Sequence, residues 1–180
     1  MASQPDGSGD NVVMGQPVQL RDMQHGDANA VLAIFAEGIA SGIATFETQC
    51  PDWTGFNQRF LSAPRLVAEQ AGQVLGWAVL SAISARACYR GVAELSVYVA
   101  SAAQGKGIGR QLLLALIEAS EAAGFWTLQG TINRRNTASI ALHKACGFRE
   151  VGYRERIAQR DGVWQDTVLL ERRSSRVGRD

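Results

Sequence analysis

The stretch Leu95-Ser96-Val97-Tyr98-Val99 is followed shortly by Gln104-Gly105-Lys106-Gly107-Ile108-Gly109-Arg110 and then by an amphipathic run over 111–123. These parts predict a strand, a glycine loop and a helix. Alternate glycines let the backbone approach an anion closely, and the free N–H groups and positive end of the following helix supply donors and a favourable field. The stretch therefore predicts a pyrophosphate-binding turn.

Two nucleotide-binding motifs fail at this loop. A Walker loop needs Ser or Thr after its lysine, but Lys106 is followed by Gly107. The dinucleotide motif GxGxxG needs a third glycine where Arg110 stands, and starting it at 107 puts Leu112 in that place. The remaining pattern, [QR]-x-x-G-x-[GA], resembles the acyl-CoA pyrophosphate loop of the Gcn5-related N-acetyltransferases. It is filled here by Gln104, Gly107 and Gly109. The alternative is a helix that begins at an ordinary glycine-rich turn.

Composition indicates one globular domain with a small-molecule partner. The 180 residues are 46% hydrophobic and 19% charged, which allows a substantial core. The formal net charge of +1 gives no field that attracts nucleic acid or an anionic membrane. Cys50, Cys88 and Cys146 are an odd number at wide spacing, which fits neither a disulfide framework nor a zinc site. We therefore expect a cytoplasmic protein that binds no metal.

The order of predicted elements indicates an α/β (α+β) layered fold. We expect a disordered leader over 1–16, one domain over 17–172 and a flexible tail over 173–180. The order βααβββαβαββ implies a mixed, mostly antiparallel sheet with helices packed on it. The family resemblance adds seven strands, about four flanking helices and splayed central strands. Strands are expected over 17–21, 65–70, 74–82, 95–99, 126–132, 149–158 and 163–170. Helices are expected from 27 to an end at Gly38 and Gly42, and over 53–61, 111–123 and 136–146.

Glu94 is the predicted general base. Side chains alternate across a strand, so the apolar residues at 95, 97 and 99 share one face and Glu94 lies on the other with Ser96 and Tyr98. An amine is mostly protonated at neutral pH and cannot attack a thioester until it loses a proton, so a carboxylate within reach is needed. The alternative is an ordinary solvent-facing glutamate.

The predicted helix over 136–146 carries a second set of candidates. Asn136, Ser139 and His143 recur at steps of three and four and form a polar stripe that faces a ligand or solvent. The segment N-x-x-S-I-x-L-H-x-x-x-G-F over 136–148 resembles the family's cofactor-contacting N-x-x-A-x-x-L-Y-x-x-x-G-F. Histidine replaces the tyrosine that protonates the departing thiolate in many relatives. His143 is therefore a candidate general acid, with Tyr98 and Tyr153 as weaker candidates and an ordinary helix histidine as the alternative.

This histidine narrows the resemblance to the phosphinothricin N-acetyltransferase group, together with Tyr89-Arg90, Thr45-Phe46-Glu47 and Gly162-x-Trp164-x-Asp166. The match runs from about 18 to 170. It implies catalytic roles for Glu94 and His143, homodimers, and small amino-acid acceptors such as phosphinothricin, methionine sulfoximine and methionine sulfone. It also implies an acetyl-CoA site made by Val97, Tyr98, Val99, Gln104, Gly105, Lys106, Gly107, Ile108, Gly109, Arg110, Asn136 and Ser139.

The acceptor site is expected to hold the carboxylate of an amino acid. A carboxylate favours a planar, permanently charged donor, and Arg86 and Arg90 lie just before the strand of the base. Phe46, Trp53 and Trp164 are candidate walls of an apolar slot, and Glu47 completes the matched segment. Surface arginines and core aromatics are the alternatives. Arg134 and Arg135 have two alternative interpretations: they contact the 3′-phosphate of coenzyme A, or they belong to an ordinary solvated turn.

The predicted mechanism is direct transfer in a ternary complex, with a backbone N–H stabilising the oxyanion. Cys146 lies on the apolar face of its helix without a paired base, so no acyl-enzyme is expected. Three rivals remain: an enzyme for protein N-termini or lysines, a non-catalytic acyl-CoA sensor, and a structural domain with an incidental glycine loop.

Overall fold

One seven-stranded sheet in the order β1-β2-β3-β4-β5-β7-β6 organises the described part of the chain, residues 16–179 of this computed structural model. Its strands are β1 (Gln19–Asp22), β2 (Arg65–Gln70), β3 (Gln73–Ala82), β4 (Val92–Val99), β5 (Thr127–Asn133), β6 (Arg149–Arg160) and β7 (Val163–Arg173). Its helices are α1 (Ala28–Ser41), α2 (Trp53–Arg59), α3 (Ile108–Ala122) and α4 (Thr137–Ala145). The predicted leader over 1–16 lies outside the described residues except for Gln16.

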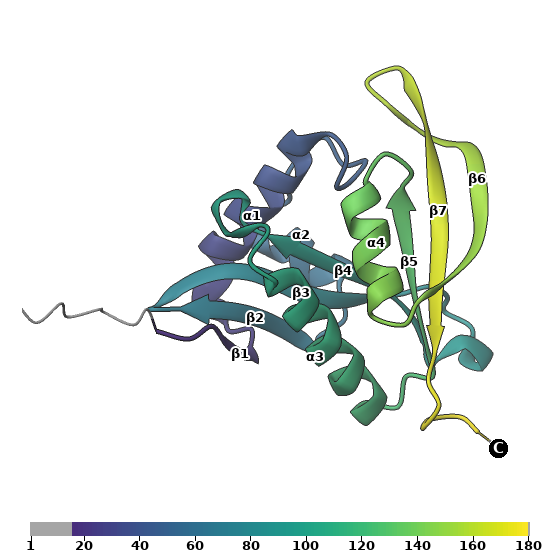
Figure 1. Cartoon of the computed structure of the whole chain (residues 1–180), viewed down its shortest axis with the longest axis horizontal. Coiled ribbons are helices and arrows are strands. Elements are labelled where there is room, and N and C mark those ends of the chain that lie inside the picture. Colours follow the sequence, from purple (N-terminus) through teal and green to yellow (C-terminus); the bar gives the residue numbers. More distant parts are fainter. Residues whose placement is uncertain (1–15, 180) are drawn as a thin grey trace, which may run out of the picture.

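The sheet splits at its centre. β4 and β5 are the parallel pair, and their register ends at Glu94 opposite Gln129, whereas the other neighbouring strands are antiparallel. Beyond that pair the two strands diverge, as Figure 1 shows. The predicted mixed, mostly antiparallel sheet with splayed central strands and four flanking helices is confirmed. The split gives a ligand access to backbone groups that a closed sheet would pair.

Both faces of β3 are buried. On β3, Ala78 and Leu80 pack in one hydrophobic cluster with α3, while Trp77 and Val79 pack in a second cluster with α1 and α2. This alternation follows from the two-residue period of a strand. Tyr98 on β4 stacks on Trp77 with ring centroids 4.6 Å apart, so the second cluster extends to the edge of the split. The rigid core thus fixes the position of β4 on both faces.

Helices α1 and α3 begin or end at other residues than the sequence predicts. The first helix was expected to end at Gly38 and Gly42, but α1 continues through Gly38 to Ser41 and Gly42 alone caps it with φ 74°. Gly38 is needed inside the helix because a Cβ there would lie 2.6 Å from the Tyr98 ring. α3 begins at Ile108, three residues before the expected 111, since the amphipathic pattern is concealed by the glycines of its first turn.

The C-terminal segment lies against the domain. β7 runs to Arg173, three residues past the expected end of the strand and one past the expected end of the domain. The Arg173 side chain donates to the carbonyls of Trp126 and Val177 at 3.0 and 2.7 Å. Arg172 forms an ion pair of 2.7 Å with Glu121 of α3. Among residues 16–179, no helix is long and apolar enough to span a membrane.

Candidate active site

The glycine loop presents unpaired backbone donors. Gly105 and Gly107 have φ of 75° and 78°, a left-handed conformation that favours glycine, and Gly107 is the N-cap of α3. Within residues 16–179, the amides from Gly105 to Arg110 have no acceptor, and the first intrahelical bond comes from Gln111 to the carbonyl of Gly107 at 3.1 Å. Such a helix start is suited to a phosphate group.

A cavity extends from this loop along the edge of β4 to α4. The residues expected to bind the cofactor, apart from Lys106, contribute to its lining: Val97, Tyr98, Val99, Gln104, Gly105, Gly107, Ile108, Gly109, Arg110, Asn136 and Ser139. The Asn136 side chain accepts from the Ser139 amide at 3.1 Å and so caps α4. We call this space the cofactor cavity.

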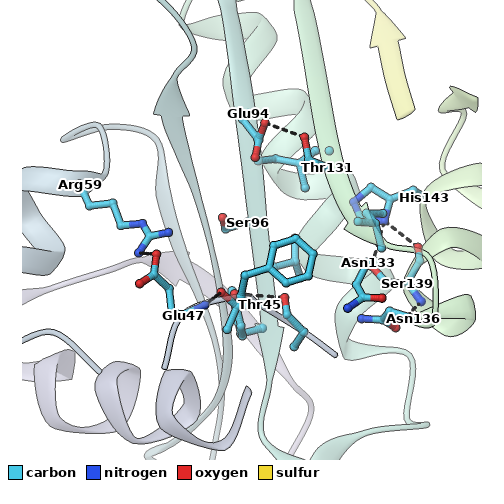
Figure 2. Close-up of a pocket in the computed structure, with 17 residues that line it drawn as sticks. Thr45, Glu47, Arg59, Glu94, Ser96, Thr131, Asn133, Asn136, Ser139 and His143 are labelled. Atoms are coloured by element: carbon cyan, nitrogen blue, oxygen red, sulfur yellow. Dashed lines mark hydrogen bonds and ion pairs between the residues drawn. The ribbon is translucent and has the colours of Figure 1, made fainter. Parts of the chain in front are cut away.

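A second cavity, which we call the acceptor cavity, lies between β4, β5, α4 and the loop over 44–47 (Figure 2). Val97, Tyr98, Asn136 and Ser139 line both cavities, so the two spaces meet at the edge of β4. A molecule in one cavity is therefore positioned to react with a molecule in the other.

Glu94 lies in the wall of the acceptor cavity at the point where β4 and β5 separate. Its Oε2 accepts hydrogen bonds from Gln129 Nε2 at 2.9 Å and Thr131 Oγ1 at 3.1 Å. Both donors belong to β5, so the strand that diverges from β4 also orients the carboxylate. Sequence reasoning identified Glu94 but missed both donors, because their role depends on the register of two strands distant in the chain.

His143 faces the acceptor cavity from α4 and is only 4% exposed. Its Nδ1 lies 2.7 Å from the Ser139 carbonyl oxygen. A carbonyl only accepts, so Nδ1 carries the proton and Nε2 presents a lone pair in the neutral ring. Nε2 is buried without a partner among the described residues. Burial lowers the pKa of His143, and the bond to Ser139 offsets this only in part.

The predicted acceptor residues separate into two groups. Phe46 and Glu47 line the acceptor cavity. Arg86 lies over the Tyr89 ring at 5.4 Å and Arg90 over the Trp126 ring at 5.3 Å, and neither lines the cavity. Trp164 is 57% exposed on the β6–β7 hairpin, also outside the cavity. Trp53 stacks on Phe56 with ring centroids 5.0 Å apart and does not line the cavity either. In one copy of the chain, the structure therefore does not bring these four side chains to the acceptor cavity.

Arg59 is a positively charged side chain in the acceptor cavity that the sequence did not point to. It is the last residue of α2, lines the acceptor cavity and pairs with Glu47 at 2.7 Å. Its guanidinium also lies 5.6 Å from the centre of the Phe60 ring, which restricts its side chain. A helix-ending arginine carries no distinctive sequence signal, so its position is known only from the packing of α2.

The remaining candidates, Tyr98, Tyr153 and Cys146, are buried or hydrogen-bonded within the protein. Tyr98 has a raised pKa because burial disfavours its charged form, and its hydroxyl lies 3.5 Å from the Ala44 carbonyl. Tyr153 bonds to Asp166 and Arg134 outside the cavity. Cys146 is 6% exposed in the core, where burial raises the thiol pKa and makes a thiolate unfavourable. Among residues 16–179, no cluster of three His, Cys, Asp or Glu side chains suits a metal ion.

Comparison with known proteins agrees with this geometry. The acetyltransferase (GNAT) family pattern matches residues 36–148. The chain is 38% identical over 159 residues to a phosphinothricin N-acetyltransferase of Alcaligenes faecalis, covering 85% of this chain and 81% of that protein. It is 34% identical to an L-methionine sulfoximine/L-methionine sulfone acetyltransferase of Pseudomonas paraeruginosa, covering 84% and 92%.

A solved structure of a similar enzyme has the same fold. The phosphinothricin acetyltransferase of Sinorhizobium meliloti in complex with AcCoA superposes with a TM-score of 0.81 at 31% identity, covering 91% of both chains. The split sheet, the unpaired glycine-loop amides and these matches lead to one identification. The chain belongs to the GNAT family of acetyltransferases.

Proposed function

We propose that this enzyme transfers an acetyl group from acetyl-CoA to the α-amino group of a small amino acid or analogue of the phosphinothricin, methionine sulfoximine or methionine sulfone type. One observation carries the proposal: the cofactor and acceptor cavities meet at the split, with Glu94 on the acceptor side. The acceptors named for the similar enzymes of Alcaligenes faecalis and Pseudomonas paraeruginosa support this substrate class.

The cofactor cavity fits acetyl-CoA. Unpaired amides from Gly105 to Arg110 suit a pyrophosphate, and the exposed edge of β4 suits an extended chain with amide groups. When bound, acetyl-CoA supplies a thioester whose carbonyl is open to nucleophilic attack. In our proposal, a backbone N–H near Val97 to Val99 stabilises the developing oxyanion.

Glu94 is the proposed general base. The carboxylate takes a proton from the acceptor ammonium, directly or through water, and the free amine can then attack the thioester. With Oε2 held by Gln129 and Thr131, the other carboxylate oxygen is available to the acceptor. The buried Cys146 thiol is not suited to form an acyl-enzyme, which favours attack in a ternary complex.

His143 is the second proposed catalytic residue. The geometry supports an acceptor role better than the predicted acid role, because a neutral ring protonated at Nδ1 has no proton at Nε2 to donate. We propose that Nε2, which is buried in the structure, becomes accessible when α4 shifts on substrate binding, and that it then accepts a hydrogen bond from the acceptor amine and orients the amine toward the thioester.

Arg59 is the proposed partner of the acceptor carboxylate. It is a permanent cation that lines the acceptor cavity, whereas Arg86 and Arg90 lie on aromatic rings outside it. Glu47 holds one side of the guanidinium through the 2.7 Å pair and leaves its other donors for a substrate.

We further propose a homodimer in the cytoplasm. Five apolar side chains on the β6–β7 hairpin are 42% to 59% exposed: Val151, Tyr153, Ile157, Val163 and Trp164. A long edge strand with such a surface favours a protein partner, and a second copy is the partner that the family resemblance implies. The free thiols of Cys50, Cys88 and Cys146 suit a reducing compartment.

A free-thiol release assay with acetyl-CoA across amino acids, amines and N-terminal peptides tests the function. We expect release with phosphinothricin, methionine sulfoximine or methionine sulfone, and mass spectrometry should locate the acetyl group on the α-nitrogen. Release only with peptides would indicate a protein acetyltransferase. Binding of acetyl-CoA with no release would indicate a sensor.

A further inference from the structure

One side chain of the β6–β7 hairpin tip is turned into the molecule. Arg160 ends β6 and precedes the Asp161-Gly162 turn, whose positive φ values of 49° and 78° are typical of a tight hairpin. Most of β6 is exposed, yet the Arg160 side chain is only 14% exposed. This contrast indicates a specific contact at the tip.

The Arg160 guanidinium spans the mouth of the split. Nη1 donates to the Thr45 carbonyl at 2.9 Å and Nη2 donates to the Ile39 carbonyl at 2.7 Å. The hairpin follows β5 in the sheet order, whereas α1 packs on β3 and β4, so these bonds join the two halves of the divided sheet. Ile39 lies in the last turn of α1, where its carbonyl also accepts from the Gly42 amide at 3.2 Å and the helix dipole favours a cation.

The loop that receives these bonds is a wall of the acceptor cavity. Ala44, Thr45, Phe46 and Glu47 all line that cavity. Within residues 16–179, no other hydrogen bond or ion pair joins residues 39–47 to the β6–β7 hairpin.

The other bonds of the loop stay within its own half of the sheet. The amides of Ile43 and Ala44 donate to the Ser41 hydroxyl, the Glu47 amide donates to the Thr45 hydroxyl, and the Tyr98 hydroxyl donates to the Ala44 carbonyl at 3.5 Å. Glu47 also pairs with Arg59 of α2. Among the described residues, the two Arg160 bonds are therefore the ones that tie this loop to the other half, and a segment with so few bonds opens easily when they are lost.

We propose that Arg160 is a positioning residue that ties the hairpin tip to the loop over 42–47 and so holds the acceptor cavity closed around its substrate. The proposal rests on the proposed acceptor role of this cavity. Arg160 touches neither reactant in this arrangement. Its effect is to fix the loop residues Phe46 and Glu47, and through Glu47 the Arg59 guanidinium.

The test compares Arg160→Met, which keeps the aliphatic stem but removes the donors, with Arg160→Lys, which keeps the charge but loses the planar fork. Amides over 42–48 should exchange with deuterium about tenfold faster in Arg160→Met, because two charge-assisted bonds that close the loop are lost. The KM for the acceptor should rise about tenfold with a smaller change in kcat, since misplaced binding groups weaken substrate positioning. Arg160→Lys should fall between Arg160→Met and the unmodified enzyme.

Arg154→Met is the matched control, because Arg154 is exposed on the same strand and makes no hydrogen bond or ion pair among the described residues. It should leave exchange and KM unchanged. Unaltered exchange over 42–48 in Arg160→Met would overturn the proposal, even if the enzyme accepted no amino acid at all. Faster exchange across the whole chain, or weakened acetyl-CoA binding, would indicate a general folding role for Arg160 and would also overturn it.

Discussion

Glu94 of β4 and Gln129 of β5 are joined by a hydrogen bond of 2.9 Å at the last aligned residue pair before the two strands separate. Thr131, two residues further along β5, donates to the same carboxylate oxygen at 3.1 Å. The divergence that opens the sheet and the orientation of the carboxylate therefore have the same origin. In this arrangement the fold sets the direction of the free carboxylate oxygen, which is the oxygen that takes the proton in the proposed mechanism.

Glu94→Gln should lower kcat/KM by about 10² to 10⁴-fold, because the variant keeps the shape of the side chain but cannot take a proton. The residual rate should rise with pH as the unprotonated fraction of the acceptor amine grows. Steady-state kinetics and calorimetric titration with acetyl-CoA measure these effects. Glu94 does not line the cofactor cavity, so an equal loss of acetyl-CoA affinity would refute the assignment.

Protonation of His143 should destabilise the fold at low pH. Burial lowers the pKa of this ring below its unfolded value near 6.5, so the unfolded chain binds a proton more readily. The stability that depends on the neutral ring is complete above pH 6.5 and decreases as the pH falls through the folded pKa. Within that window the free energy of unfolding should fall by up to about 1.4 kcal/mol per pH unit.

Chemical denaturation of His143→Gln between pH 5 and 8 checks this prediction. The variant should lose part of the wild-type pH dependence, and His25→Gln, a substitution of an exposed histidine outside both cavities, serves as the comparison. Identical slopes for the wild type and His143→Gln would contradict a neutral buried imidazole.

Local patterns predicted the parts of the site that lie on single elements. Alternation along β4 placed Glu94 opposite the apolar face, and the glycine spacing located the loop that begins α3. The polar stripe on α4 was also informative, because Asn136 and Ser139 line both cavities and His143 lines the acceptor cavity. The pattern did not predict that the His143 ring would be buried, with the Phe148 ring packed edge-on against it at 5.2 Å.

Contacts between distant segments were beyond sequence reasoning. Arg59 reaches the acceptor cavity through the packing of α2, and Thr131 reaches Glu94 through the register of β4 and β5. Arg160 meets Thr45 across 115 positions of the chain. Arginines at 86 and 90 are nearer in sequence to the base, yet nearby aromatic rings hold them elsewhere. Proximity in sequence was therefore a poor guide to which arginine lines the acceptor cavity.

Gly107→Ala should weaken acetyl-CoA binding about tenfold, which is about 1.4 kcal/mol. A Cβ meets no atom at this position, but its φ of 78° is strained for alanine by roughly 1–2 kcal/mol, so the loop should shift and misalign its amides. Gly72→Ala is a matched control, with φ 79°, equally open surroundings and no place in the cofactor cavity. Both variants should lose similar stability by thermal denaturation, and only Gly107→Ala should lose affinity. Equal affinities would disprove the role of the loop.

Arg59→Met should raise the KM for an amino-acid acceptor about tenfold or more, since a charge-assisted bond to the substrate carboxylate is lost. The same variant should bind acetyl-CoA normally, because Arg59 lines only the acceptor cavity of the two. Decarboxylated amine analogues should be nearly insensitive to the change. Arg86→Met serves as the comparison, and a larger rise in KM for that variant would move the carboxylate role to Arg86.

Ile157→Glu and Trp164→Glu should convert the proposed homodimer to monomers. Both side chains are more than half exposed on the β6–β7 hairpin, and a buried, unpaired carboxylate at an interface is costly. Leu114→Glu on α3 is the control, since Leu114 is also exposed, at 39%, but lies on a different face from the hairpin. Sedimentation velocity over a range of concentrations measures the outcome. A wild-type chain that remains monomeric at all concentrations would rule out the dimer, and the exposed hairpin would then need another partner to cover Trp164.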